Sequence, residues 1–273
     1  MAKLIYKPKG AAGEYAAYAV NFVNGCSNDC SYCYNKSGVV AKTLGGNKVT
    51  WKKVIEDAAE KAHRTCLNMA YNMFCKDVDS MEEELKREGI FFNFVSDPFL
   101  DETRFITMEC VDECILRGIP VTVLTKMYDA YLTIVTLINC EERSKRQEYL
   151  NKMRKYLKVG FTLTGCDEEE PGASPNDERI IAMSLLKKEY GLYTWASIEP
   201  ILDLSKSAQM IVKSLPYCDE YRIGLVSGRK RPYSPSQVMQ WKNDVERCIG
   251  WLGYKKNIVW KSSVMEYIKK IDK

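Results

Sequence analysis

Residues 25–35 read GCSNDCSYCYN and place three cysteines, Cys26, Cys30 and Cys33, within eight positions. This C-x3-C-x2-C run directly follows the apolar stretch YAVNFV at 18–23, which is typical of a buried β-strand. The N-terminus lacks the continuous apolar run of a signal peptide, so we expect a cytoplasmic protein with reduced thiols. Metal binding, catalysis or plain burial is therefore a better explanation of the cysteines than a disulfide framework.

The composition narrows the class of protein. The chain has 273 residues, 46% hydrophobic and 28% charged, enough for a substantial core in an ordinary globular protein. No apolar run approaches the length of a membrane span, so no membrane partner is expected. The net charge of +4 permits an anionic substrate without demanding nucleic acid. His63 is the only histidine, which excludes catalysis by a pair of histidines and most histidine-rich metal sites.

Short apolar runs alternate with longer helical patterns along the chain. Strands are predicted at 18–23, 90–95, 120–125, 158–164, 192–198 and 221–227, and helices at 50–88, 103–117, 129–157, 175–190, 205–215 and 235–250. Such alternation predicts right-handed crossovers and a parallel sheet. Six units are too few for a closed eight-stranded barrel. We therefore predict one α/β domain over 1–273, a partial (βα)6 TIM-type barrel with a curved parallel sheet, outer helices and a short C-terminal extension. Its core covers about 16–230, followed by a helix and tail at 231–273.

Predicted helix ends depend on particular residues. Ser174, Ser234 and either Asp203 or Ser205 are expected to cap helices, and Gly118 and Gly191 to end them. In parallel α/β folds reactive groups gather at the carboxyl ends of the strands. The cysteine run lies at that end of the first strand.

Two metal centres compete for the cysteine triplet. A structural zinc site needs four ligands, normally from two paired clusters, and no second C-x2-C is present. The nearest other cysteine is Cys66. Three thiolates suit a [4Fe–4S] cluster that leaves one iron open to an external ligand. We favour one such cluster, with zinc as the alternative.

The loop C-x3-C-x2-C with an aromatic at Tyr32 resembles the signature of the radical S-adenosylmethionine (SAM) superfamily. In that superfamily the open iron binds the amino and carboxylate groups of SAM. One electron then splits SAM to methionine and a 5′-deoxyadenosyl radical, which abstracts hydrogen from the substrate. The resemblance implies SAM as cofactor, an electron donor such as flavodoxin or ferredoxin, and a place for Tyr32 near the adenine.

Five further blocks resemble the spore photoproduct lyase-like branch of this superfamily. They are GEYAAYAVNFVNGCSNDCSYCY, FVSDPFLDETR, GIPVTVLTK, VGFTLTGCDEEEPGASPNDERI and WASIEPILD, in order over residues 13–203. This resemblance implies SAM contacts for Ser96, Asp97, Lys126 and Thr162, an orienting role for Glu199, and a place for Arg179 in the same polar shell. The chemistry agrees, since a lysine can pair with the SAM carboxylate and a serine or aspartate can accept from its ammonium.

One departure from the family pattern concerns the reaction. Spore photoproduct lyase has a cysteine beside the residues that match Ser96 and Asp97, and it returns hydrogen to the repaired thymine. This chain has Val95 there. The same photoproduct repair is therefore not expected. Cys166, in TLTGCDEEEP after the fourth predicted strand, is the candidate hydrogen donor, with simple burial as the alternative.

The substrate is indicated only by charge and by the resemblance. Arg229, Lys230 and Arg231 follow the last predicted strand and could bind phosphate or a nucleotide backbone, or form a solvated loop. The tail after 252 adds lysines and aromatics that could stack bases, although a C-terminal strand and helix fits better. Nucleic acid or a nucleotide leads as substrate class. A peptide or small metabolite, and a non-enzymatic zinc or iron–sulfur module, remain open.

Overall fold

An eight-stranded sheet forms the centre of the computed structural model, which describes residues 3–36, 39–42, 44–140, 142, 144–226 and 231–272. The strand order is β1 (Ile5–Tyr6), β2 (Ala19–Val20), β5 (Ile90–Phe92), β6 (Val121–Thr125), β7 (Leu157–Thr162), β8 (Tyr193–Ile201), β9 (Glu220–Leu225) and β10 (Asn257–Trp260). Every neighbouring pair from β2 to β10 is parallel, and β1 joins β2 antiparallel. A separate antiparallel pair consists of β3 (Val23–Asn24) and β4 (Thr50–Trp51).

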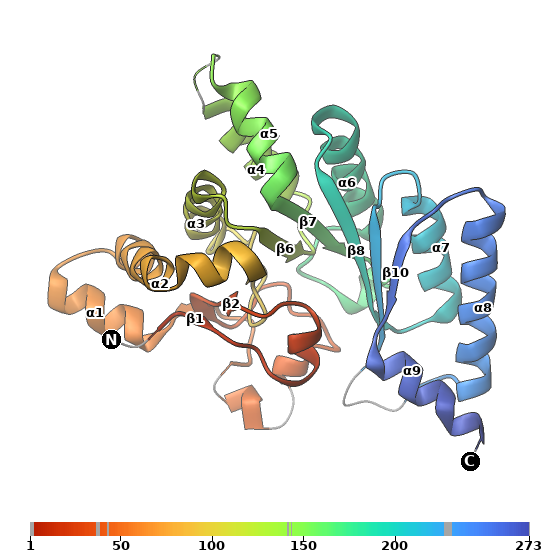
Figure 1. Ribbon diagram of the computed structural model, residues 1–273. Coiled ribbons are helices and arrows are strands. Elements are labelled where there is room, and N and C mark those ends of the chain that lie inside the picture. Colours follow the sequence, from red (N-terminus) through yellow and green to blue (C-terminus); the bar gives the residue numbers. More distant parts are fainter. Residues whose placement is uncertain are drawn as a thin grey trace.

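Helices connect and flank these strands. They are α1 (Lys53–Ala62), α2 (Cys66–Glu88), α3 (Arg104–Arg117), α4 (Ala130–Cys140), α5 (Arg146–Tyr156), α6 (Asn176–Tyr190), α7 (Leu204–Ser214), α8 (Pro235–Trp251) and α9 (Ser262–Ile268). Short 3-10 turns are η1 (Gly10–Glu14), η2 (Tyr34–Lys36), η3 (Val39–Lys42), η4 (Asp167–Glu169) and η5 (Lys269–Asp272). Figure 1 shows α6, α7 and α8 beside β8 and β10, with α2 and α3 at the N-terminal half of the sheet.

The predicted open α/β architecture is confirmed. All six predicted parallel strands are present, and β10 continues the sheet as a seventh. In the described part of the chain the two edges of the sheet, β1 and β10, do not pair with each other, so the barrel is not closed. Two helical regions expected to be continuous are divided: 50–88 into α1 and α2, and 129–157 into α4 and α5. His63, with φ +50°, separates the first pair in the left-handed region.

Most of the predicted helix ends are confirmed. Gly118 and Gly191 end α3 and α6 with φ of +74° and +65°, which glycine adopts without strain. Asp203 caps α7, and Ser234 caps α8 in a capping box. Ser174 was the wrong choice, because Pro175 occupies the N-cap of α6. The Ser174 hydroxyl instead accepts from the Tyr128 backbone N–H at 2.9 Å.

The packing of β7 against β8 explains one glycine in the sheet. A Cβ on Gly160 would lie 2.1 Å from Cε2 of Trp195, so the indole fills the space where a side chain would be. Trp195 is fully buried and packs with Ala19 of β2 and Phe91 of β5. The inner face of the sheet is therefore apolar below the ends of the strands.

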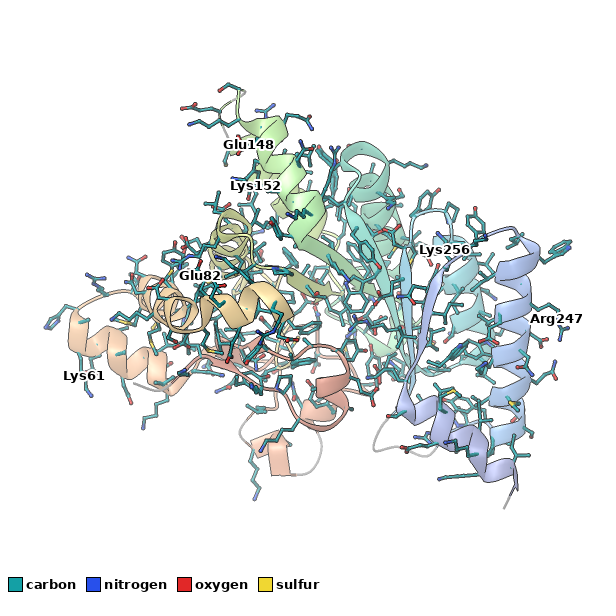
Figure 2. The ribbon with its side chains drawn as sticks, viewed as in Figure 1. Lys61, Glu82, Glu148, Lys152, Arg247 and Lys256 are labelled. Atoms are coloured by element: carbon teal, nitrogen blue, oxygen red, sulfur yellow. The ribbon has the colours of Figure 1, made fainter. Side chains whose placement is uncertain are left out.

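Charged side chains lie on the outer helix faces. Figure 2 shows Glu148 and Lys152 on α5 and Arg247 on α8 directed away from the sheet. Glu148 and Lys152 form an i,i+4 ion pair of 3.3 Å on the exposed face of α5. Among the helices that the structure describes, none combines the length and apolar character needed to cross a membrane.

Candidate functional site

A cavity of about 520 Å³ opens at the carboxyl ends of the parallel strands. Residues that follow β5, β6 and β9, residues of β8 and the cysteine loop line it. Of the residues predicted to form the site, Cys26, Cys30, Cys33, Tyr32, Ser96, Asp97, Lys126, Thr162 and Glu199 all contribute to its wall. The structure therefore brings nine predicted residues from five parts of the sequence to one space.

The cysteine loop is fixed by backbone contacts. Gly25 has φ +78°, and a Cβ there would lie 2.1 Å from the Lys48 carbonyl oxygen, so only glycine fits. The Cys26 N–H donates to the Gly46 carbonyl at 3.1 Å, and the Cys33 N–H donates to that of Cys30 at 3.2 Å. The loop thus holds three thiols against the cavity.

Burial makes the thiols of Cys26 and Cys30 hard to ionise. It raises the pKa of Cys26 to about 12, and the nearby Asp97 carboxylate adds to the effect. Burial also raises the pKa of Cys30, although the Lys126 ammonium opposes it. A metal that binds here must therefore displace protons from the thiols.

Three thiols on one wall fit a [4Fe–4S] cluster by donor chemistry. Within the described residues, no three His, Cys, Asp or Glu side chains converge tightly enough to hold one metal ion. A four-iron cluster takes each thiolate at a different iron and does not require such convergence. The sulfur ligands and the space beside them therefore match a cluster.

Asp97 connects the cysteine loop to the sheet. Its Oδ1 accepts from Thr125 Oγ1 at 2.6 Å and from the Phe99 N–H at 3.0 Å. Its Oδ2 accepts from Asn28 Nδ2 at 3.0 Å and from the Lys126 N–H at 2.7 Å. Both oxygens are occupied by the protein. Asp97 thus holds the cysteine loop and the end of β6 in register.

Ser96 and Lys126, in contrast, keep polar groups open. The Ser96 Oγ is buried and has no hydrogen-bond partner among the described residues. Lys126 Nζ lies 5.5 Å from the centre of the Tyr32 ring. Burial opposes its charge, but the thiol of Cys30 and the Glu170 carboxylate outweigh that effect and raise the pKa of Lys126. A hydroxyl and an ammonium are thus available to a ligand.

Tyr32 and Arg179 meet through a buried glutamate. The Tyr32 hydroxyl donates to Glu170 Oε1, and Arg179 Nη2 pairs with Glu170 Oε2 at 2.7 Å. Arg179 Nη1 also donates to the Thr162 carbonyl at 2.9 Å. The side chains of Arg179 and Glu170 are fully buried. Arg179 therefore lies behind the wall of the cavity, where it holds Tyr32 and the end of β7.

Glu199 is held by two residues that the sequence had not marked. Lys261 Nζ donates to Glu199 Oε2 at 2.8 Å, and the Tyr15 hydroxyl donates to the same oxygen. A Cβ on Gly224 would lie 2.6 Å from Glu199 Cδ, so a side chain at this position would displace the carboxylate. Besides Tyr15 and Lys261, Asn93 also lines the cavity without having been predicted from the sequence.

Among the described residues, three predicted site residues do not line the cavity: Arg179, Cys166 and Arg231. Cys166 is buried but does not line the cavity, and burial raises the pKa of its thiol to about 11. Arg231 Nε donates to the Val226 carbonyl at 3.4 Å, and its guanidinium lies over the Tyr267 ring at 4.5 Å. Arg229 and Lys230 lie outside the residues that the structure describes.

The sheet order and the position of the cavity define an open parallel α/β barrel protein, and solved structures share that architecture. A cysteine-to-serine mutant of spore photoproduct lyase aligns with a TM-score of 0.59 and 12% identity, over 93% of this chain and 79% of that one. A cysteine-to-alanine mutant with dinucleoside spore photoproduct gives 0.57 and 13% over the same shares. The open fold expected from the resemblance in sequence is thereby confirmed.

SuiB from Streptococcus suis, in a structure bound to S-adenosylmethionine, aligns with a TM-score of 0.47 and 14% identity. The alignment covers 68% of this chain, which spans only 43% of SuiB. No protein-family profile matches the sequence. No curated protein matches it either.

Proposed function

We propose that this chain is a radical SAM enzyme, with one [4Fe–4S] cluster on Cys26, Cys30 and Cys33 and SAM in the adjoining cavity. The observation that carries the proposal is the meeting of three thiols with open polar groups in one 520 Å³ space at the strand ends. When bound and reduced, such a cluster supplies the electron that converts SAM to methionine and a 5′-deoxyadenosyl radical. A flavodoxin or ferredoxin is the proposed source of that electron.

The open groups of the cavity match the charges of SAM. The Ser96 hydroxyl can accept from the ammonium of SAM, and the Lys126 ammonium can pair with its carboxylate. Thr162 and Tyr32 complete the wall on the β7 side, and Glu199 orients the ligand from β8. Asp97 and Arg179 are positioning residues, because their side chains bond to the protein itself.

The proposed substrate class is nucleic acid or a nucleotide. The fold shared with the dinucleoside-containing lyase mutant supports this class, as does Lys9, which lines the cavity. We assign hydrogen donation to no cysteine, since Val95 stands at the family's donor position and Cys166 does not line the cavity. Phosphate binding by Arg229, Lys230 and Arg231 is a separate part of the proposal.

The test begins with anaerobic reconstitution using iron and sulfide. Dithionite and SAM are added, and 5′-deoxyadenosine is followed by chromatography. We expect product from the wild type and from Cys140→Ala, which alters an exposed thiol on α4, but none from Cys30→Ala. Stoichiometric zinc and failure to load iron would support the non-enzymatic alternative.

A loaded cluster that yields no product calls for a SAM titration. Binding without cleavage would mean that turnover awaits substrate, whereas no binding would contradict the assignment of the SAM site. Retention on DNA or RNA that falls with salt supports a nucleic-acid substrate. Salt-insensitive function without such retention favours a peptide or small metabolite.

A further inference from the structure

We propose that Asn93 recognises a nucleobase of the substrate through its side-chain amide. The residue follows β5 directly and lines the cavity, yet it is only 7% exposed. Within the described residues, neither its Oδ1 nor its Nδ2 has a hydrogen-bond partner. Asn93 thus offers a buried donor beside a buried acceptor at the cavity wall.

The surrounding segment shows that this open amide is not a sign of a loose loop. Asn21 Oδ1 accepts from the Phe94 and Val95 N–H groups at 2.9 and 3.1 Å, and Asn21 Nδ2 donates to Tyr6 at 2.7 Å. Asn35 Nδ2 donates to the Val95 carbonyl at 2.8 Å. The backbone after Asn93 is therefore held firmly. Burying an amide without partners is unfavourable, so an unpaired one in a fixed segment indicates a ligand that completes it.

Two aromatic residues close to Asn93 in the sequence, Phe91 and Phe94, line the same cavity. Phe91 and Phe94 stack with centroids 4.4 Å apart and planes 18° apart. The Tyr15 ring meets Phe94 edge-on at 6.1 Å. Phe91 is fully buried against Phe94, but Phe94 is partly exposed and can stack on a base of any identity. An asparagine amide can also distinguish one base from another. It forms two hydrogen bonds with a base edge that presents a donor beside an acceptor, as adenine does at N6 and N7.

The base in question belongs to the substrate rather than to SAM. The adenine of SAM is assigned to the neighbourhood of Tyr32, which bonds to Glu170 and adjoins Lys126. Asn93 directly follows β5, and the neighbouring rings of Phe91 and Phe94 contact Tyr15 of the N-terminal segment. This inference rests on the proposed function for its choice of substrate, and it names the part of the cavity that would hold it.

The test compares wild type with Asn93→Leu and Asn21→Leu. AMP and ribose 5-phosphate, which lacks the base, are titrated by calorimetry into unreduced protein, with and without SAM and the reconstituted cluster. We expect Asn93→Leu to weaken AMP binding at least tenfold and to leave ribose 5-phosphate and SAM binding unchanged. The melting temperature should not fall in Asn93→Leu, because no internal hydrogen bond is lost, but should fall in Asn21→Leu.

Three results would overturn this inference. They are AMP binding unaffected by Asn93→Leu, SAM binding weakened in place of AMP binding, and a melting temperature lowered as far as in Asn21→Leu. Absence of AMP binding by the wild type would overturn it as well. The proposed function fails separately, because cluster loading and 5′-deoxyadenosine formation are measured on the same wild-type preparation without AMP.

Discussion

Lys261, which precedes α9, donates to Glu199 on β8 at 2.8 Å across 62 positions of sequence. The Lys261 side chain is only 4% exposed, and its ammonium also lies 4.2 Å from the centre of the Tyr15 ring. Both residues line the cavity. The C-terminal segment is therefore part of the candidate site, and it holds a carboxylate that the central strands alone would leave unpaired.

Lys261→Met is expected to leave Glu199 without its cation. Breaking a buried ion pair on one side costs about 3 kcal/mol, because the remaining charge stays desolvated. We expect a loss of that order in the free energy of urea unfolding, reduced for the partial exposure of Glu199. Lys261→Met with Glu199→Gln should recover most of it.

The control for this pair is Lys242→Met, which removes a more exposed i,i+4 partner of Glu246. Such pairs contribute about 0.3–0.5 kcal/mol. If Lys242→Met and Lys261→Met lost the same free energy of unfolding, the larger contribution that we assign to the buried Lys261–Glu199 pair would be contradicted.

Gly224→Ala tests the packing beside the same carboxylate. The new methyl group would begin 2.6 Å from Glu199 Cδ, so the carboxylate must move away from Lys261 and Tyr15. Overpacking of this kind costs roughly 1–3 kcal/mol. We expect that loss of stability together with weaker SAM binding in a titration of the reconstituted protein.

Gly250→Ala provides the matched glycine control. A Cβ at Gly250 on α8 meets nothing within 4 Å, and alanine favours a helix by up to about 1 kcal/mol over glycine. This variant should be as stable as wild type or slightly more stable, with unchanged SAM binding. A destabilised Gly250→Ala would show that glycine replacements act through something other than contact with Glu199.

Asp97 and Ser96 are neighbours with opposite expected effects. Asp97→Asn replaces one carboxylate oxygen by an NH2 group, which donates hydrogen bonds. Each oxygen of Asp97 accepts from two donors, so the new NH2 group would face two donors and leave them without an acceptor. Unpaired buried donors cost about 1–3 kcal/mol each, so unfolding should become easier and iron loading should fall. Ser96→Ala removes a hydroxyl without a described partner and should leave stability and loading unchanged.

Ser96→Ala should nevertheless weaken SAM binding several-fold if its hydroxyl accepts from the ammonium. Iron content per chain, chemical unfolding and SAM titration measured together separate the two roles. Normal iron loading in Asp97→Asn would show that the cysteine loop does not depend on this carboxylate.

Glu220 gives a dependence on pH. Burial acts to raise the pKa of its carboxyl, but the hydrogen bond and charge of Arg222 outweigh burial and lower that pKa below the usual 4.5. A lowered folded pKa means that the stabilisation is complete above the unfolded value and is lost as pH falls through the folded value. The stability difference between wild type and Glu220→Gln should therefore shrink below about pH 4.5 in urea titrations. A constant difference down to pH 3 would contradict this.

The strands and the cysteine loop could be predicted because their signals are local. Apolar runs such as YAVNFV bury both faces, and a glycine directly after the last helical residue ends α3 and α6. Ser174 was misassigned because its hydroxyl bonds to Tyr128 from another segment, which no local pattern shows. Parallel pairing then places the residues after successive strands at one edge.

Tyr15, Asn93 and Lys261 escaped prediction for the opposite reason. Lysine at the start of a short helix and tyrosine near an N-terminus are ordinary in any chain, and Asn93 lies within an apolar run. Lys261 reaches the cavity only because β10 extends the sheet beside β9. The acidic run at 167–170 concealed Glu170 in the same way, since its partner Arg179 is recognisable only in three dimensions.

The sequence by itself determined the open parallel α/β architecture and the presence of three thiols after the first strand, because burial periodicity and cysteine spacing are properties of neighbouring residues. Only the tertiary structure decided which side chains face a ligand and which face the protein. Asp97 and Ser96 are adjacent, yet the carboxylate is fully bonded inside and the hydroxyl is open. That division depends on which donors distant segments bring within hydrogen-bond distance.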